Sequence, residues 1–514
     1  MPDSPNILFI AVDDLFEFTA FRNSFGVEIQ TPNMDRLLEK SAHFENAFAT
    51  TPVCNPSRTS SLTGKSPFET NVLDNVAAWH EENPIEESLP AALKDDGYHT
   101  ASAGKIFHGY KPQPDFVNDR VFSENVPDIR DSFDGNAGVS NGGGWQAKGY
   151  TGADDQFYDH KVASWGVEFL EEYDQDDPFM LMLGFKHPHN NFEAPQQYYD
   201  LYDLDQIKVP DSWVAGDLSD APAFAQQFMH KGQFFPDKDL DQWKGTVEGY
   251  LAAISHADAQ IGRVLDALDA SDHANNTAIL LHSDHGFQLG DKDHFGKFTL
   301  WEESAKAPLF LHLPGMTEGT TISTPVSLID IMPTLLDLAG ADPAPYAIGE
   351  SLMPLVDDDY GAHSGGPVFT QVYGSLSIRD GDMRFIRYAD GSEELYDTAT
   401  DPGQNTNLAN DPAYEGQLET LRDTLWDEAA IYGLTTNDDD ATLTGTEGRD
   451  VLMAQPETET LEGGAGDDIY FLYDNTAEVI EAEEGGHDLA YLSGLGPIDL
   501  PDNVEDGFIG EIGR

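Results

Sequence analysis

Four apolar runs punctuate the first 300 residues of this 514-residue chain. Three of the runs are short and nearly continuous in hydrophobic side chains, and the fourth, at Tyr98–Ala103, is weaker. A continuous run is typical of a parallel strand buried on both faces, so the pattern predicts an α/β fold around a central, mostly parallel sheet. The four predicted strands are Asn6–Val12, Tyr98–Ala103, Pro178–Phe185 and Thr277–Ser283.

Charged or imidazole side chains follow each predicted strand. Ligands of open α/β sheets bind at the carboxyl ends of strands, so we expect these side chains to share one site. Adjacent carboxylates such as Asp13 and Asp14 repel each other unless a cation or hydrogen bonds satisfy them. A helix cap is the simpler alternative for a single aspartate. The residues in question are Asp13, Asp14, Lys105, His108, His187, His189, Asp284 and His285. The oxygen-rich part of this set favours a hard cation such as calcium or magnesium.

The only cysteine, Cys54, opens the run Cys54-Asn55-Pro56-Ser57-Arg58. Pro56 suits the first turn of a helix, because its missing N–H costs nothing there. A helix N-terminus favours an anion, since its N–H groups are unpaired and its dipole end is positive. The run therefore indicates a chemically active side chain at position 54. The alternative is a buried, inert cysteine beside a helix start.

The same five residues match the Cys-x-Pro-Ser-Arg signature of the type I sulfatases. Over residues 5–432 the chain resembles the iduronate-2-sulfatase-like group of the alkaline-phosphatase-like superfamily. This resemblance implies the sulfatase sandwich fold and hydrolysis of a sulfate ester. The matching segments are Val12–Leu15, Thr31–Leu37, Asn46–Ala49, Gly104–His108, Pro188-His189, Ser283–Gly286, Leu289-Gly290, Lys297, Ser327–Thr334, Glu394–Asp397 and Asp401–Gly403.

The resemblance also implies a role for each site residue. Cys54 would be oxidised by a formylglycine-generating enzyme, and its hydrated aldehyde, oriented by Arg58, would attack sulfur. His108 would then deprotonate the spare hydroxyl and expel sulfate. Either His189 or Lys297 would protonate the leaving alcohol. The residues implied to grip the sulfate are Lys105, His189 and Lys297. The implied ligands of a divalent cation, calcium or alternatively magnesium, are Asp13, Asp14, residue 54, Asp284 and His285.

Two positions bear on the substrate class. Most sulfatases carry asparagine at the position of His285. A histidine is found there in the iduronate-2-sulfatase-like group, in choline sulfatases and in phosphonate monoester hydrolases. The last two groups usually carry a neutral residue where this chain has Asp14, so we expect a sulfated sugar as substrate. A phosphonate monoester or phosphodiester hydrolase is the alternative enzyme. His187, Lys292 and His294 are expected to touch the substrate or to be structural surface residues.

Beyond residue 367 the hydrophobic pattern changes. The segment 368–433 predicts a small antiparallel sheet, with a hairpin turn at Ala389–Ser392, followed by a helix over Tyr414–Ile431. We therefore assign residues 1–367 to a catalytic domain and residues 368–433 to a C-terminal subdomain.

The composition changes again after Gly433. An acidic linker at 434–440 leads into residues 441–514, in which Arg449 and Arg514 are the only basic residues. Leu461–Tyr470 resembles the calcium-binding repeat of hemolysin-type (RTX) proteins, which implies a short β-roll-like tail that binds calcium through Asp467 and Asp468. The alternative is a disordered acidic tail.

Charge and hydropathy limit the partners. With 27 basic and 93 acidic residues, the net charge of −66 disfavours nucleic acid and anionic membranes as partners. No stretch is apolar for long enough to predict a membrane span, and the N-terminal run is too short for a signal peptide. Proteins with RTX repeats are typically exported by a type I secretion apparatus. We therefore predict a secreted enzyme exported by that route. The remaining alternative is a calcium-binding surface protein with an inactive sulfatase-like domain.

Overall fold

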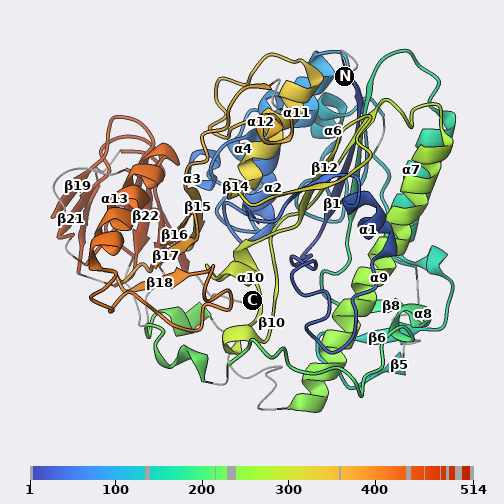
Figure 1. The fold of residues 1–514 in the computed structure, drawn as a ribbon. Helices are drawn as coiled ribbons and strands as arrows, with labels where there is room; N and C mark the ends of the chain where they lie inside the picture. Colours follow the sequence, from blue (N-terminus) through green and yellow to red (C-terminus); the bar gives the residue numbers. More distant parts are fainter. Residues whose placement is uncertain are drawn as a thin grey trace.

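A seven-stranded sheet lies at the centre of the computed structural model (Figure 1). Its strands are β1 (Asn6–Val12), β2 (Ala42–Phe44), β4 (His99–Gly104), β7 (Phe179–Phe185), β9 (Thr277–Ser283), β12 (Leu309–His312) and β13 (Thr320–Ile322). They are ordered β13-β2-β12-β9-β1-β7-β4. The structure describes residues 4–124, 126–132, 139–214, 216–228, 239–357, 360–435, 441–456, 458–474, 476–481, 485–492 and 500–509.

The four strands predicted from the apolar runs are adjacent in this sheet. β9, β1, β7 and β4 pair in parallel, whereas β12 is antiparallel to both β9 and β2. The predicted bounds of β1 and β9 are those observed, and β4 and β7 each begin one residue later than predicted. The prediction of an α/β fold with a mostly parallel central sheet is confirmed.

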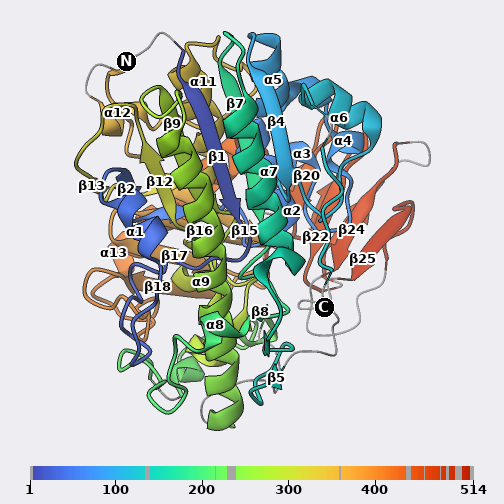
Figure 2. The ribbon, with the colours of Figure 1, turned by 90° about the vertical axis from the view of Figure 1, so that its right-hand side faces the viewer.

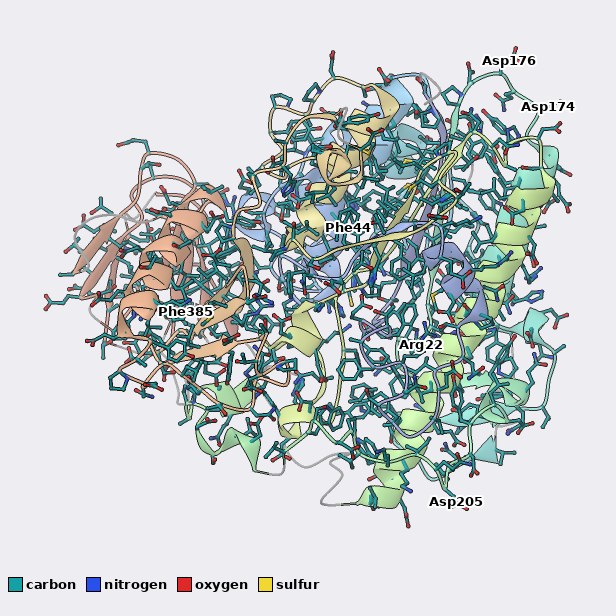
Figure 3. All side chains as sticks on the ribbon, in the orientation of Figure 1. Arg22, Phe44, Asp174, Asp176, Asp205 and Phe385 are labelled. Atoms are coloured by element: carbon teal, nitrogen blue, oxygen red, sulfur yellow. The ribbon has the colours of Figure 1, made fainter. Side chains whose placement is uncertain are left out.

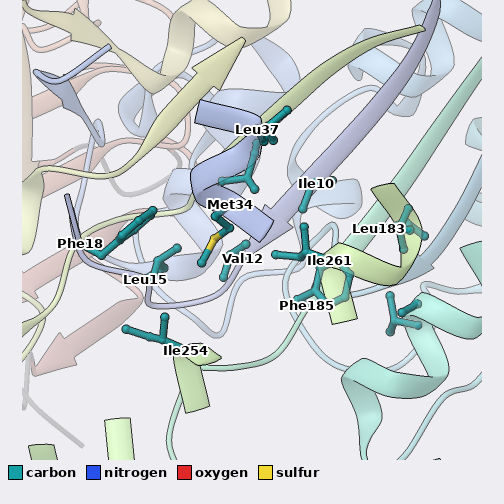
Figure 4. Packing of buried hydrophobic residues seen from close by; sticks show 14 of the residues in the cluster. Ile10, Val12, Leu15, Phe18, Met34, Leu37, Leu183, Phe185, Ile254 and Ile261 are labelled. Carbon is teal, nitrogen blue, oxygen red and sulfur yellow. The ribbon is translucent and has the colours of Figure 1, made fainter. Parts of the chain in front are cut away.

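Both faces of the sheet are covered by helices (Figure 2). Alternate residues of β1 pack into two separate hydrophobic clusters, because successive side chains of a strand point to opposite faces. Ile10 and Val12 join α7 (Tyr158–Glu172) and α9 (Leu240–Ala270) in one cluster, part of which Figure 4 shows. Ile7, Phe9 and Ala11 join α5 (Leu89–Asp95) and α11 (Ile331–Ala339) in the other. Burial on both faces explains why β1 and β7 are apolar along almost their whole length, whereas the edge strand β4 also contains polar residues.

Shorter elements complete the catalytic part. The helices are α1 (Pro32–Leu38), α2 (Cys54–Thr63), α3 (Pro67–Thr70), α4 (Trp79–Glu82), α6 (Asp115–Val121), α8 (Gln196–Tyr199), α10 (Glu302–Ala305) and α12 (Met353–Val356). The short strands are β3 (Ala47–Phe48), β5 (Val139–Ser140), β6 (Lys148–Tyr150), β8 (Glu193–Pro195), β10 (Gln288–Leu289), β11 (Phe295–Gly296) and β14 (Val326–Ser327). Within the described ranges, no helix has the length and apolar character that crossing a bilayer requires.

Side chains fill the space between these layers (Figure 3). Phe44 and Phe385 are fully buried, whereas the acidic side chains Asp174, Asp176 and Asp205 are exposed at the periphery. The large acidic excess of the chain therefore lies in part on surface loops, where water solvates the charges.

The predicted C-terminal subdomain is an antiparallel sheet with one helix against it. Its strands are β15 (Val368–Val372), β16 (Ser375–Asp380), β17 (Met383–Arg387) and β18 (Glu393–Asp397). Helix α13 (Glu415–Ile431) buries Leu418, Leu421, Leu425 and Ala429, the spacing that predicted it.

The tail is a small roll of parallel strands. One sheet contains β19 (Thr442–Thr444), β21 (Thr460–Glu462) and β23 (Glu478–Ile480). The other contains β20 (Val451–Met453), β22 (Ile469–Leu472), β24 (Leu489–Leu492) and β25 (Asp506–Ile509). All pairs in both sheets are parallel, and from β19 to β24 successive strands alternate between the two sheets. The β-roll-like shape expected for the tail is present. The proposed linker lies mostly outside the described residues, and the domain boundaries stay predictions.

Strand β22 of the roll contributes side chains to two hydrophobic clusters. Phe471 of β22 packs in the same cluster as Phe68 and Phe369 of the catalytic part and the subdomain. Its neighbours Tyr470 and Leu472 face the interior of the roll. The Phe471 and Phe68 rings meet edge to face, with 5.9 Å between their centroids. The roll is therefore packed on the rest of the protein through a shared apolar interface.

Phe471→Ala should destabilise more than the roll alone, because it removes a ring from this shared cluster. We expect the free energy of unfolding to fall by about 3–5 kcal/mol. Denaturant unfolding followed by tryptophan fluorescence measures the loss. Ile480→Ala, at a side chain 45% exposed on the other sheet of the roll, is the control and should cost less than about 0.5 kcal/mol. Unchanged unfolding in Phe471→Ala would mean that the roll folds independently.

Candidate active site

The carboxyl ends of β1 and β9 bring the predicted acidic residues together. Val12 and Ser283, the last residues of the two strands, are partners in the sheet, so Asp13-Asp14 and Asp284-His285 emerge side by side. The backbone N–H of Asp14 donates to Oδ1 of Asp284 at 3.1 Å. Adjacent strand ends thus convert two distant sequence segments into one cluster.

Cys54 lies against this cluster at the start of α2. Val53, just before it, is extended, so the helix begins at Cys54, and all ten residues of α2 are buried. The Sγ atom lies 3.4 Å from Nε2 of His285 and 3.8 Å from Oδ1 of Asp14. The helix start that the sequence predicted is confirmed, and its first side chain points at the strand ends.

Four predicted ligands form a group that can hold a metal ion. Asp14, Cys54, Asp284 and His285 each offer one ligand atom, and these atoms all lie within 4.8 Å of one another. All four residues are buried. Two of the four ligand atoms are carboxylate oxygens, which suit a hard divalent cation, whereas the imidazole is a less typical ligand for one.

Asp13, the fifth predicted ligand, is outside that group and is held by cations. Lys105 places its Nζ atom 2.6 and 2.8 Å from the two carboxylate oxygens of Asp13. Arg58 approaches Oδ1 at 3.2 Å, and the hydroxyl of Tyr110 donates to Oδ2 at 2.6 Å. In this arrangement Asp13 positions Lys105 and Arg58 beside the metal-capable group.

Two cations, Arg58 and Lys297, contact the group directly. Nε of Arg58 donates to Oδ2 of Asp284 at 2.8 Å, with both side chains buried. Nζ of Lys297 lies 2.6 Å from Oδ1 of Asp14 and 2.8 Å from Sγ of Cys54. Lys297 therefore joins the acidic cluster to the side chain at position 54.

The neighbouring charges shift the pKa values of two of the buried ligands, Cys54 and His285. Burial opposes ionisation of Cys54, but the ammonium groups of Lys105 and Lys297 outweigh it and lower its pKa to about 6. Burial also disfavours a charged His285, yet the Asp284 carboxylate raises its pKa to about 9. The Asp284 carboxylate thus stabilises a positive charge on His285, and the two lysines stabilise a negative charge at position 54.

His108 and His189 lie close enough to sense these charges. Burial, reinforced by Lys105, lowers the pKa of His108 to about 3, so its ring is neutral with a free lone pair. Its buried Nδ1 atom has no hydrogen-bond partner among the described residues. Burial would also lower the pKa of His189, but Asp14 and Asp13 outweigh it and raise that pKa. Nε2 of His189 lies 3.9 Å from Oδ2 of Asp14.

The remaining polar residues named from sequence are buried in structural contacts. His187 pairs with Asp159 at 2.6 Å, Lys292 pairs with Asp217 at 2.6 Å, and His294 contacts the carbonyl of Lys297 at 2.8 Å. All three are less than 5% exposed, so they are not surface residues. Tyr110, which contacts Asp13, was not predicted, because it lies in an irregular segment with no periodic signal.

Sequence comparison places this site in a known family. The sulfatase family profile matches residues 5–341, and the profile of the C-terminal region of N-sulphoglucosamine sulphohydrolase matches residues 290–430. A sulfatase of Formosa agariphila is 34% identical over 84% of this chain and 89% of its own length. Human iduronate 2-sulfatase is 28% identical over 67% of this chain and 70% of its own length.

Solved structures share the fold at lower identity. One, determined with its substrate D-glucosamine-2-N,6-O-disulfate, superposes with a TM-score of 0.67 at 22% identity and covers 84% of this chain and 98% of its own. The phosphonate monoester hydrolase of Agrobacterium radiobacter gives a TM-score of 0.68 at 21% identity, over 83% and 96% of the two chains. These likenesses show the fold, while the profile match over most of the chain and the 34% identical relative show that the protein belongs to the sulfatase family of sulfuric ester hydrolases.

Proposed function

We propose that this sulfatase removes sulfate from a sulfated sugar, using a formylglycine made from Cys54 as its nucleophile. The observation that carries the proposal is the position of Cys54. Its side chain lies at the first residue of a buried helix, between the acidic cluster and Lys297. Relatives named for iduronate 2-sulfatase activity and a similar structure bound to a sulfated glucosamine support a sugar substrate.

Asp14, Asp284 and His285, with residue 54, would hold a divalent cation, for which we propose calcium. The fit rests on the burial of all four donors and on the two carboxylates among them. When bound, such a cation polarises the ester oxygen and stabilises the attacking oxygen. Asp13 would contribute by fixing Lys105 and Arg58.

The other side chains have assignable tasks. Arg58 orients Asp284 and residue 54, and Lys105 and Lys297 bind the sulfate oxygens and stabilise the charge that grows on them. His189, whose pKa is raised by Asp14 and Asp13 despite its burial, would donate a proton to the leaving alcohol. Nearby carboxylates raise the pKa of Lys297 much further, despite its burial, so Lys297 is the poorer acid. His108, whose Nδ1 atom has no hydrogen-bond partner in the described part of the chain, would act as the base that completes turnover.

Experiments can distinguish this proposal from two alternative functions, a phosphonate monoester hydrolase and an inactive calcium-binding protein. The phosphonate monoester hydrolase shares the fold, and the same cations would bind a phosphonate. The carboxylate of Asp14 is our reason for preferring a sulfate ester. Rates on an aryl sulfate, a phenyl phosphonate and sulfated sugars, compared for one preparation, would decide the class. An inactive calcium-binding protein is disfavoured by the intact cluster around Cys54.

We further propose that the tail binds calcium and that the protein is exported by type I secretion. Asp468 is fully buried, and its Oδ2 atom has no hydrogen-bond partner among the described residues. Glu481 and Asp488 each have a carboxylate oxygen within 4.8 Å of a carboxylate oxygen of Asp468. Burial, with these two carboxylates nearby, raises the pKa of Asp468 to about 7, as expected where acidic groups crowd together. Asp467 is exposed and accepts a hydrogen bond from the His487 backbone, so we place it at the edge of this cluster.

Cys54→Ala should abolish turnover, lowering kcat by at least about 10³-fold, because the nucleophile is removed while the cations remain. In active wild-type protein, mass spectrometry of the peptide containing residue 54 should show a loss of about 18 Da from the cysteine form. Near-normal activity in Cys54→Ala would contradict the mechanism.

Calcium removal and two matched variants separate the proposed metal sites. Asp14→Asn and Asp468→Asn should each lower the calcium content by about one ion per chain, since each loses a charged ligand. Only Asp14→Asn, like chelation of the whole protein, should lose activity. Equilibrium dialysis with metal analysis gives the ion count, and sulfate release gives the rate. Full activity after complete chelation would exclude a catalytic cation.

His108→Ala should release one equivalent of alcohol per active site in a rapid burst and then turn over slowly. The reason is that a base is needed only after the alcohol has left. Pre-steady-state kinetics with a chromogenic sulfate ester would resolve the burst. His43→Ala, at a buried histidine paired with Glu17, is the matched control and should keep normal turnover. Normal steady-state turnover in His108→Ala would remove this residue from the mechanism.

A further inference from the structure

Two aromatic residues have unusual backbone conformations beside Lys297. Phe298, the next residue in the chain, has φ 77°, and Tyr373 has φ 45°. Positive φ brings Cβ close to the following carbonyl oxygen, so bulky side chains are rarely found there. Such conformations concentrate at functional sites, where the surrounding structure imposes them.

Tyrosine is an unfavourable residue type at position 373 of the turn in which it lies. With Gly374, at φ 80°, it forms the two-residue connection between β15 and β16, closed by the pair Val372 and Ser375. Two successive residues of positive φ are characteristic of a type I′ hairpin turn, for which Asn-Gly is the preferred sequence. A tyrosine in the first position costs turn stability, which suggests that its ring has another use.

The two rings lie together at the edge of the active site. Their centroids are 6.3 Å apart and their planes differ by 23°, so they stack. Nζ of Lys297 is 6.0 Å from the Phe298 ring centroid and 2.8 Å from Sγ of Cys54. Both rings are only partly buried.

Backbone contacts fix this position. The N–H of Phe298 donates to the carbonyl of Pro52 at 3.3 Å, and that of Gln371 donates to Thr50 at 2.8 Å. Both acceptors lie in the segment that leads directly into Cys54. The stacked rings are therefore held in register with the nucleophile position.

The roll supports the turn from behind. A Cβ atom on Gly374 would lie 3.2 Å from Cδ1 of Phe471, so the glycine allows β22 to approach closely. Phe471 in turn stacks on Tyr491 with 5.2 Å between centroids. The turn that carries Tyr373 is thus packed between the active site and the tail.

The charged residues of the site explain binding of the sulfate group but not of the alcohol to which it is attached. Aromatic faces carry partial negative charge and complement the C–H faces of a sugar ring, and ligand pockets commonly combine such rings with a few polar groups. We propose that Phe298 and Tyr373 form an aromatic platform that stacks on the sugar ring of the sulfate ester and makes the enzyme selective for cyclic sugars. This inference rests on the proposed function and adds the residues that determine its specificity.

The test compares a sulfated monosaccharide with a short acyclic alkyl sulfate, which has no ring to stack. Tyr373→Asn and Phe298→Ala should lower kcat/KM for the sugar sulfate by about 10- to 100-fold, the range for loss of one stacking ring. For the alkyl sulfate the change should stay within about twofold. Tyr373→Phe, which keeps the ring, should resemble wild type on both substrates.

Stability measurements separate the platform from a purely structural role. Tyr373→Asn should unfold at a higher temperature than Tyr373→Ala, because Asn suits the type I′ turn, yet both should lose the sugar preference equally. Tyr346→Ala, which removes a partly buried ring beneath Lys65, is the control and should leave both rates unchanged.

Equal losses on the two substrates, or an unchanged sugar preference in Tyr373→Asn, would overturn the platform while leaving the sulfatase function intact. Failure of the proposed function has a different signature. The wild-type enzyme would then hydrolyse neither sulfate ester, and the variants would give no ratio to compare.

Discussion

Asp13, Asp14 and Asp284 are buried at the carboxyl ends of β1 and β9, where their carboxylates would repel one another without compensation. A buried charge left unpaired costs several kcal/mol, so the fold depends on the cations that meet them. Those cations come from separate elements, with Arg58 on α2, Lys105 after β4 and Lys297 after β11. Charge neutralisation therefore fixes the relative positions of the sheet, helix α2 and the loop after β11.

Sequence periodicity was sufficient to predict the central strands and the meeting of their polar ends. A strand buried on both faces must be apolar throughout, and the first polar residues after it must lie at the sheet edge, as Asp13 and Asp284 do. The platform residues could not be predicted this way. The sign of φ at Phe298 and Tyr373 is set by tertiary contacts with the segment before Cys54, and neither residue type favours it.

The tail shows a similar limit. Its parallel strands follow from the alternation and glycine spacing of the sequence, but its attachment does not. Residues of β22 face two ways, with Tyr470 inside the roll and Phe471 against Phe68. Alternation alone shows that one face is apolar without revealing which neighbour covers it. The acidic linker predicted at 434–440 separated the tail from the subdomain, whereas the apolar face of β22 is part of a larger core.

The complete burial of α2 limits when residue 54 can be chemically modified. Cys54 is 1% exposed, and every residue of its helix is buried. A second enzyme cannot reach this sulfur atom while the native packing lasts, since access would require the helix to leave the core. Any enzymatic conversion of residue 54 must precede the completion of folding. The chain thus has a single early interval in which the proposed formylglycine can be made, and molecules that fold first stay unconverted.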